Sequence, residues 1–252
     1  MNTHLRKILS KIAENKFIYR LAQRIAYDHN GENNCDITTN GEMAALKRYL
    51  NDCKVVFDVG ANVGEWSETV LRINPKIDLH SFEPSQKTFQ KLSENINQEN
   101  VILNNIGLGS KKEKKSFYNY GDESTVNSLY ARDLKADTKN EEVLIDTLDN
   151  YSKEKNINLI DFLKIDVEGN EFEVLKGSQD MLKNGKIKII QLEYGGTYID
   201  ANVWLKDVWE YFKDFNYVWY KILPNELRLI EKYDQSMDNF QYANYLLINK
   251  PS

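Results

Sequence analysis

The stretch "VVFDVGANVGEWSETV", residues 55–70, constrains the fold of this chain more than any other feature of the sequence. An apolar run of strand character is followed by an acid, by two glycines four residues apart, and by apolar residues at helical spacing. Strand, glycine turn and helix in this order are typical of the first unit of an α/β domain whose turn holds a nucleotide-like ligand. The stretch therefore predicts an α/β fold with a ligand site at this turn.

Strand-like and helix-like segments alternate along the rest of the chain. The strand-like segments include "IDLHSFEP", "VILNNIGL", "IDFLKIDVEG" and "KIKIIQLEYGG", with helix-like segments such as "SQKTFQKLSENINQ" and "NEFEVLKGSQDMLKNG" between them. Such alternation predicts a doubly wound, mostly parallel sheet. The final strand-like segments, "YVWYKILP" and "YANYLLINK", have no helical pattern between them, which predicts one antiparallel strand near the carboxy terminus. Residues 110–145 are polar and irregular, with room for a hairpin.

Composition excludes several classes of protein. Hydrophobic residues make up 41% of the 252 residues and charged residues 28%, which is ordinary for a globular protein. The net charge of −5 argues against non-specific binding of nucleic acid, because such binding needs a basic surface. The chain has only two cysteines, Cys35 and Cys53, and they form no CxxC motif. We therefore expect a reduced, cytoplasmic protein that does not bind nucleic acid.

The amino-terminal segment is basic and amphipathic. Its apolar residues recur at helical spacing and six lysines and arginines interrupt them, so we expect neither a signal peptide nor a membrane-spanning helix. The apolar positions are Leu5, Ile8, Leu9, Ile12, Ile18, Leu21 and Ile25. One reading is a helix that packs on its own domain or on a second subunit of a homo-oligomer. The other is peripheral contact with an anionic membrane surface.

The glycine turn narrows the choice of ligand. Gly60 and Gly64 let the backbone bend sharply and approach a ligand closely, and Asn62 tolerates left-handed backbone angles. Asp58 ends the strand, and Glu83 stands at the tip of the next strand. An acid at that tip can accept hydrogen bonds from both hydroxyls of a ribose. A dinucleotide and S-adenosylmethionine both carry such a ribose.

The departures from the dinucleotide fingerprint favour S-adenosylmethionine. The fingerprint G-x-G-x-x-G requires glycine at positions 60, 62 and 65, where this chain has Gly60, Asn62 and Glu65. A glutamate at position 65 would face a pyrophosphate at the start of the helix that should attract it. S-adenosylmethionine has no phosphate and carries a cationic sulfonium, so acids nearby are tolerated. A nicotinamide-dependent dehydrogenase is the less favoured alternative.

Several motifs together resemble the FkbM-type family of S-adenosylmethionine-dependent methyltransferases. They are "FDVGANVGEWS", "SFEPSQKTFQKLSENI", "NIGLGSKKEKKSFY", "IDTLDNY", "IDFLKIDVEGNEFEVLKG" and "QLEYGG", in order over roughly residues 40–196. The resemblance implies a Rossmann-like class I methyltransferase domain over residues 40–252, preceded by a basic helix and linker over residues 1–39. It also implies O-methylation, commonly of a sugar hydroxyl in a surface glycan or glycoconjugate. The acceptor would thus be a carbohydrate, or alternatively a small-molecule hydroxyl of a non-sugar secondary metabolite.

The same resemblance assigns cofactor contacts. It implies that the turn after the first strand lines the methionine part of S-adenosylmethionine and that Glu83 binds the ribose. Residues after the third strand, Asn105, Ile106 and Gly107, would lie near the adenine. The turn residues implied are Asp58, Gly60, Asn62 and Gly64.

Three carboxylates are candidates for catalysis. Asp166 and Glu168 follow the strand "DFLKI", and they share one face if the strand continues that far. Glu193 ends the neighbouring strand. A sugar hydroxyl is a poor nucleophile, so a positioned carboxylate could act as general base, and we favour Asp166 first and Glu193 second. Asp166 could instead only bind the cofactor. We expect no required metal, although the same carboxylates could hold Mg²⁺.

Two regions are candidates for binding the acceptor substrate. The polar loop "YGDESTVNSLYARD" offers Ser128 and Tyr130, and long loops are commonly functional. It also offers Ser124, Thr125 and Asn127, and its alternative reading is a surface insertion without a role. Downstream of Glu193, aromatic rings could stack on a sugar face, although such dense aromatics also form cores or subunit interfaces. These rings are Tyr194, Tyr198 and Trp204.

Overall fold

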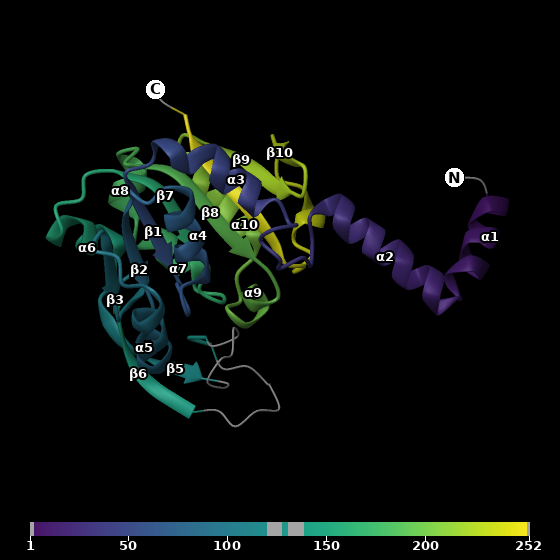
Figure 1. Ribbon diagram of the computed structural model, residues 1–252. Coiled ribbons are helices and arrows are strands. Elements are labelled where there is room, and N and C mark those ends of the chain that lie inside the picture. Colours follow the sequence, from purple (N-terminus) through teal and green to yellow (C-terminus); the bar gives the residue numbers. More distant parts are fainter. Residues whose placement is uncertain (1–2, 120–127, 131–138, 251–252) are drawn as a thin grey trace.

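The main sheet has eight strands, in the order β10-β9-β11-β8-β7-β1-β2-β3 (Figure 1). This computed structural model describes residues 3–119, 128–130 and 139–250. Five adjacent strands pair in parallel and form the larger part of the sheet. They are β1 (Val55–Val59), β2 (Asp78–Phe82), β3 (Val101–Asn104), β7 (Ile160–Ile165) and β8 (Ile187–Tyr194). The prediction of a mostly parallel α/β sheet is confirmed.

The other end of the sheet is antiparallel. Strand β11 (Ala243–Asn249) lies between β8 and β9 (Tyr217–Leu223) and runs against both, as predicted for the end of the chain. Strand β10 (Glu226–Ile230) pairs with β9 as a second antiparallel element at the sheet edge. Strand β10 was not predicted, because the segment between the last two predicted strands was interpreted as an irregular connection. The intervening Pro224 and Asn225 are the two residues of a hairpin turn.

Helices cover both faces of the parallel strands, as a doubly wound sheet requires. Neighbouring residues of one strand point to opposite faces, so Val56 packs in one hydrophobic core and Phe57 in the other. The Val56 side is covered by α3 (Glu42–Tyr49), α4 (Glu65–Ile73) and α5 (Gln86–Asn95). The Phe57 side is covered by α6 (Leu148–Glu154), α7 (Glu171–Lys176), α8 (Gln179–Lys183) and α10 (Leu205–Tyr211).

A small three-stranded sheet accounts for the polar region that follows β3. Strands β5 (Glu113–Asn119) and β6 (Lys139–Asp146) pair antiparallel, so the expected hairpin-like element is present. The predicted strand "VILNNIGL" is divided into β3 and β4 (Gly107–Leu108), because β4 leaves the main sheet to pair with β6. The order of this second sheet is β4-β6-β5.

The predicted helix after β7 is likewise divided, into α7 and α8. Gly177 separates them at a point where the backbone meets the chain after β4. A Cβ on Gly177 would lie 1.9 Å from the backbone oxygen of Gly109, so no other residue fits this contact. A long-range packing contact therefore interrupts a helix that local sequence would have continued.

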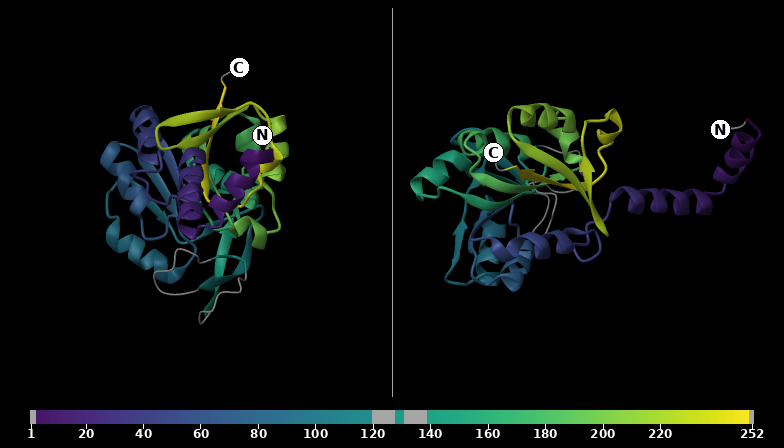
Figure 2. Two further views of the ribbon diagram at one scale, coloured as in Figure 1. Left: turned by 90° about the vertical axis from the view of Figure 1, so that its right-hand side faces the viewer. Right: turned by 90° about the horizontal axis from the view of Figure 1, so that it is seen from above.

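The basic amino-terminal segment projects away from the body of the protein (Figures 1 and 2). It forms two helices rather than one, α1 (Thr3–Ala13) and α2 (Lys16–Asn30). Asn15 divides them, because its side-chain oxygen accepts hydrogen bonds from the first backbone N–H groups of α2. Helix α2 has no buried residue, so the structure does not support packing of this segment on its own domain. Among the described residues, none of the helices is long and apolar enough to cross a bilayer.

Candidate active site

The carboxyl ends of β1, β2, β7 and β8 meet at one edge of the sheet, because parallel strands all point the same way. The chain leaving β1 is tied to the end of β2, since Gly60 N–H and Ala61 N–H both donate to the Phe82 carbonyl, at 3.0 and 2.9 Å. The residues that were predicted to bind the cofactor and to take part in catalysis lie at or just after the strand ends along this edge. It is the candidate active site.

The turn after β1 has the backbone that its sequence predicted. Gly60, Asn62 and Gly64 all have positive φ angles, of 88°, 49° and 98°. A Cβ on Gly60 would lie 1.8 Å from the backbone oxygen of Asp166, so the turn presses directly against the chain leaving β7. Asn62 keeps the left-handed geometry that a glycine would otherwise supply. Gly64 then precedes the first residue of α4, Glu65.

Glu83 is buried at the tip of β2 and shapes this turn. Its Oε2 accepts a hydrogen bond from Asn62 N–H at 3.1 Å, and its Oε1 accepts one from Ser85 N–H at 2.9 Å. Burial raises the pKa of Glu83 to about 7, although both backbone hydrogen bonds oppose the shift. Each carboxylate oxygen accepts one backbone N–H, so lone pairs remain on both.

The residues predicted to lie near an adenine are next to Glu83. The Asn105 amide donates to the backbone carbonyls of Glu83 and Pro84, at 2.9 and 3.1 Å. Asn105 therefore fixes the backbone at the tip of β2. Ile106 is half-buried and packs against the hydrophobic core on the Phe57 side.

Asp58 is fully buried at the end of β1, so its side chain is not exposed at the turn, where the resemblance implied a contact with the methionine part of the cofactor. Its Oδ2 accepts a hydrogen bond from the Ser67 hydroxyl at 2.7 Å. Its Oδ1 lies 3.7 Å from the ammonium of Lys164. The same ammonium lies 2.9 Å from Asp166 Oδ2, so Lys164 links the ends of β1 and β7.

Lys164 lies at the candidate site and was not predicted from the sequence. It lies in β7, whose six residues are all buried, and its side chain is 10% exposed. Burial alone would lower the pKa of Lys164, but the carboxylates of Asp166 and Asp58 outweigh it and raise that pKa. The signal was present, since a lysine between apolar residues near the end of a buried strand needs an acidic partner.

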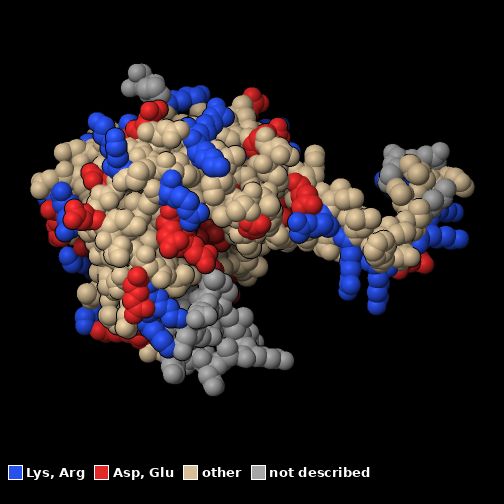
Figure 3. All heavy atoms as spheres, viewed as in Figure 1, with Lys and Arg blue, Asp and Glu red and all other residues tan. Residues whose placement is uncertain are grey.

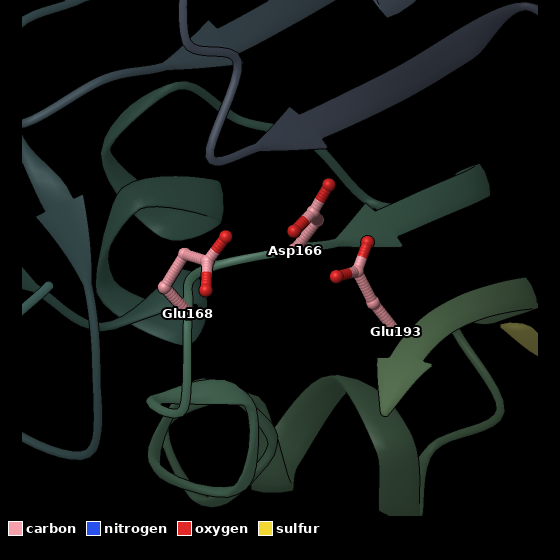
Figure 4. Close-up of side chains that lie close together, drawn as sticks. All are labelled: Asp166, Glu168 and Glu193. Atoms are coloured by element: carbon pink, nitrogen blue, oxygen red, sulfur yellow. The ribbon is translucent and has the colours of Figure 1, made fainter. Parts of the chain in front are cut away.

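Asp166, Glu168 and Glu193 face a common space at the strand ends (Figure 4). One carboxylate oxygen from each lies within 4.8 Å of the others. Strand β7 ends at Ile165, so strand alternation does not align Asp166 with Glu168. Glu168 instead has a left-handed φ of 55°, and this turn brings its carboxylate back towards Asp166. The predicted convergence is present, but a turn produces it.

The close approach of these three carboxylates affects the pKa of Glu193. Burial, together with the negative charges of Asp166 and Glu168, raises the pKa of Glu193 well above its usual value. A carboxyl group with a raised pKa is a stronger base once ionised. The three carboxylates could also bind a hard divalent cation through oxygen. That no metal is required stays a prediction.

A second buried acid fixes the turn that carries Glu168. Glu171 accepts hydrogen bonds from Val167 N–H at 2.9 Å and from Gly169 N–H at 3.0 Å. Burial raises the pKa of Glu171 to about 8, against the opposing effect of these backbone hydrogen bonds. Glu171 is the first residue of α7, and from that position it also supports the turn that carries Glu168.

Glu42 is a further buried acid that the sequence did not reveal. Its carboxylate accepts hydrogen bonds from the side-chain amides of Asn40, Gln191 and Asn244. Burial raises the pKa of Glu42, and Lys164 partly offsets the shift. This network joins α3 to β8 and β11, segments that are too far apart in sequence for any motif to show the contact.

The loop residues predicted to read the acceptor lie beside the Glu168 turn. Ser128 is buried, and its hydroxyl donates to the Glu168 carbonyl at 2.8 Å, so it supports the turn. Tyr130 is half-buried, with a ring carbon 3.4 Å from where a Cβ on Gly169 would lie. A ligand contact remains a prediction for both. Three other residues predicted in this loop lie outside the described part of the chain: Ser124, Thr125 and Asn127.

The aromatic residues after β8 are placed differently from the prediction. Tyr194 and Tyr198 are both 1% exposed, and their rings pack edge to face in the hydrophobic core. Neither ring therefore has a free face for a sugar in this structure. Trp204 is half exposed and packs against Phe240, which makes it the one ring of the predicted three with accessible surface.

The sequence of this chain is similar to those of known methyltransferases. The family model "Methyltransferase FkbM domain" matches residues 58–219. A "Methyltransferase 1" from Beauveria bassiana is 27% identical over 149 residues, covering 51% of this chain and 60% of that protein. A "Hexuronic acid methyltransferase AglP" from Haloferax volcanii is 27% identical over 162 residues, covering 62% of this chain and 64% of that protein. The chain thus spans less than two thirds of either relative.

A solved structure is similar at a lower level of sequence identity. A crystal structure of a methyltransferase FkbM from Methylobacillus flagellatus superposes with a TM-score of 0.48 and 16% identity. The superposition covers 77% of this chain and 44% of that one.

Replacing Lys164 tests whether the Asp58–Lys164–Asp166 ion pairs stabilise the fold. The substitution Lys164→Met should lower the free energy of unfolding by about 3–5 kcal/mol, because it leaves buried carboxylates without their counter-charge. Adding Asp58→Asn should restore part of the loss. Lys213→Met, which removes an exposed ion pair with Glu210, should cost less than about 1 kcal/mol. If denaturant unfolding shows that Lys164→Met and Lys213→Met lower the free energy of unfolding equally, the Lys164 ion pairs do not stabilise the fold.

Proposed function

We propose that this chain, which belongs to the FkbM methyltransferase family, is an S-adenosylmethionine-dependent O-methyltransferase that methylates a sugar hydroxyl in a surface glycan or glycoconjugate. One observation carries the proposal. The glycine turn, the buried Glu83 and the three clustered carboxylates meet at one edge of the sheet. S-adenosylmethionine, when bound, supplies a methyl group activated by its positive sulfonium.

The residues at the turn fit this cofactor. Glu83 is buried and hydrogen-bonded to backbone N–H groups on both oxygens, and the lone pairs that remain can accept the two ribose hydroxyls. Gly60 and Gly64 let the backbone approach the methionine part, while Asn105 and Ile106 lie beside the predicted adenine position. Because Asp58 is enclosed, we assign it to shaping the turn through Ser67 and Lys164 rather than to direct contact.

A nicotinamide dinucleotide fits this turn less well. Glu65 is the first residue of α4 and is exposed, so its carboxylate stands at the helix end where a pyrophosphate would bind. Like charges at this position would oppose that ligand. The acids that surround the turn are compatible with a positively charged sulfonium.

Donor binding gives the first test. Isothermal calorimetry should show binding of S-adenosylmethionine and none of NAD. Glu83→Gln should weaken donor binding about 10- to 100-fold, because it removes a charged acceptor of hydrogen bonds. The exposed Glu99→Gln should have no effect. Because the pKa of Glu83 is about 7, wild-type affinity should fall as the pH drops below 7 and Glu83 is protonated. Tight binding of NAD would contradict the proposal.

The carboxylates divide into two roles. Asp166 is ion-paired with Lys164 at 2.9 Å, so its carboxylate is already engaged by a cation and held in place. Glu193 has a raised pKa and faces the same space, so we now favour Glu193 over Asp166 as the general base. In this role Glu193 takes the proton of the acceptor hydroxyl, while Asp166 and Glu168 orient that acceptor.

The pH dependence of turnover tests this division. Glu193 acts as a base only when ionised, so kcat/KM for the acceptor, measured with S-adenosylmethionine saturating at every pH, should rise with pH through the raised pKa of Glu193 and then level off. Glu193→Gln should lower kcat by about 10²–10⁴-fold and remove the rising limb. The exposed Glu210→Gln should behave like wild type. A different result would assign the base to Asp166: the rise of kcat/KM with pH would disappear in Asp166→Asn and persist in Glu193→Gln.

The nature of the acceptor is the least constrained part of the proposal. A relative named for methylation of a hexuronic acid supports a sugar. The three clustered carboxylates would repel the carboxylate of a hexuronic acid, so we propose a hydroxyl of a neutral sugar as the acceptor.

Mass spectrometry of the host's surface glycans should identify this acceptor. Loss of the protein should remove one methylene mass per methylated residue, and wild-type protein with S-adenosylmethionine should restore it to glycans from the deficient cells. The Glu193→Gln variant should fail to restore it. Unchanged glycan masses, combined with turnover on a non-sugar metabolite, would transfer the activity to the alternative acceptor class.

A further inference from the structure

Residues 3–30, which form α1 and α2 and are called the arm below, expose an unusual amount of apolar surface. Phe17 is 74% exposed and Ile25 is 60% exposed. Other large apolar side chains of the arm are also exposed: Leu5, Leu9, Ile12, Ile18, Tyr19 and Leu21. Contiguous apolar surface of this kind marks a site of interaction.

The apolar side chains lie on one face of each helix. In α1, Leu5, Leu9 and Ile12 are spaced by four and three residues, which places them on one side. In α2, Ile18, Leu21 and Ile25 are spaced by three and four residues. Both helices are therefore amphipathic, each with an apolar face that nothing covers within the described part of the chain.

Within the residues that the structure describes, the contacts that hold the arm to the body lie at its carboxyl end. A Cβ on Gly31, which follows α2, would lie 2.7 Å from the Ile222 carbonyl of β9, so the chain is held closely there. Arg228 of β10 donates to the carbonyl of His29, at 3.2 Å. From this anchored end the two helices extend away from the methyltransferase domain (Figure 2).

The charge of the arm is opposite to that of the body. Six lysines and arginines against two acids, Glu14 and Asp28, give the arm a net charge of +4. Since the whole chain carries −5, the remaining residues carry −9. Figure 3 shows the basic side chains gathered along one side of the projecting helices. The basic residues are Arg6, Lys7, Lys11, Lys16, Arg20 and Arg24.

We propose that the arm binds the surface of an anionic lipid membrane. Its apolar faces would enter the boundary between headgroups and acyl chains, while its lysines and arginines pair with lipid phosphates. Exposed aromatic rings at Phe17 and Tyr19 suit the same boundary. The arm would lie in the interface and would not span the bilayer.

Charge favours a membrane over pairing of two arms. Two arms packed together would bring two segments of net charge +4 into contact, and this charge already includes Glu14 and Asp28 of each arm. Within the described residues, Asp28 already pairs with Arg24. An anionic surface instead complements the whole row of basic residues. Docking of the arm on the acidic body of a second copy is the competing occupant, and the experiment separates the two.

Co-sedimentation of the full chain with lipid vesicles tests the proposal. The protein should bind vesicles of phosphatidylcholine and phosphatidylglycerol, bind pure phosphatidylcholine much more weakly, and dissociate as salt rises. The triple variant Lys7→Gln, Lys11→Gln, Lys16→Gln should bind about 100-fold more weakly, at roughly fivefold per basic residue. A matched triple variant of exposed body lysines, at Lys153, Lys183 and Lys213, should bind like wild type.

The apolar contribution is tested in the same assay. Phe17→Ser with Ile25→Ser should weaken vesicle binding at least tenfold, because both side chains are largely exposed and would enter the bilayer. Leu144→Ser with Leu229→Ser, two half-exposed positions on the body, should leave it unchanged. Unchanged thermal unfolding of each variant would confirm that the fold is intact.

Two outcomes would overturn the proposal. The first is a wild-type protein that stays in solution with anionic vesicles at low salt. The second is a dimer detected by light scattering that the Phe17 and Ile25 substitutions dissociate, in a protein that ignores vesicles. That result would assign the arm to a second copy of the chain. Neither measurement depends on methyl transfer, so the proposed function and the membrane contact can fail separately.

Discussion

The site depends on one buried cation. The Lys164 ammonium lies between Asp58 and Asp166, and it allows two carboxylates to occupy the tips of adjacent central strands. Without that charge, the cost of burying Asp58 close to the carboxylate of Asp166 would oppose the contact of the β1 turn with the chain after β7. Gly60 makes that contact, against the backbone of Asp166 itself. The glycine turn and the cluster of carboxylates are thus joined by a close backbone contact and by ion pairs.

The consequence is a crevice with more acids than cations among its described side chains. Lys164 pairs with Asp166 at 2.9 Å, and the carboxylates of Glu193 and Glu168 lie beside that pair. This arrangement raises the pKa of Glu193 and separates a positioning acid from a candidate base. The same excess of negative charge suits a positively charged donor and disfavours a phosphate-bearing one.

Much of the fold was predictable, because parallel strands and their crossover helices leave local periodicities in the sequence. The failures have specific physical causes. The helix after β7 breaks at Gly177 because a distant backbone oxygen, that of Gly109, occupies the space of a side chain. The arm is two helices because Asn15 caps the second one, and β10 is a short edge strand whose pattern is too brief to stand out.

The sequence alone determined the strand–turn–helix at residues 55–70, the left-handed turn at Asn62 and the acid at the tip of β2, Glu83, because neighbours in the chain set these features. Only the tertiary structure decided the pairing of Lys164, the burial of Tyr194 and Tyr198, and the exposure of the arm. Burial and electrostatic partners depend on residues far away along the chain, brought close by packing. A strand motif can place an acid at a crevice, but only the folded neighbours set its charge state.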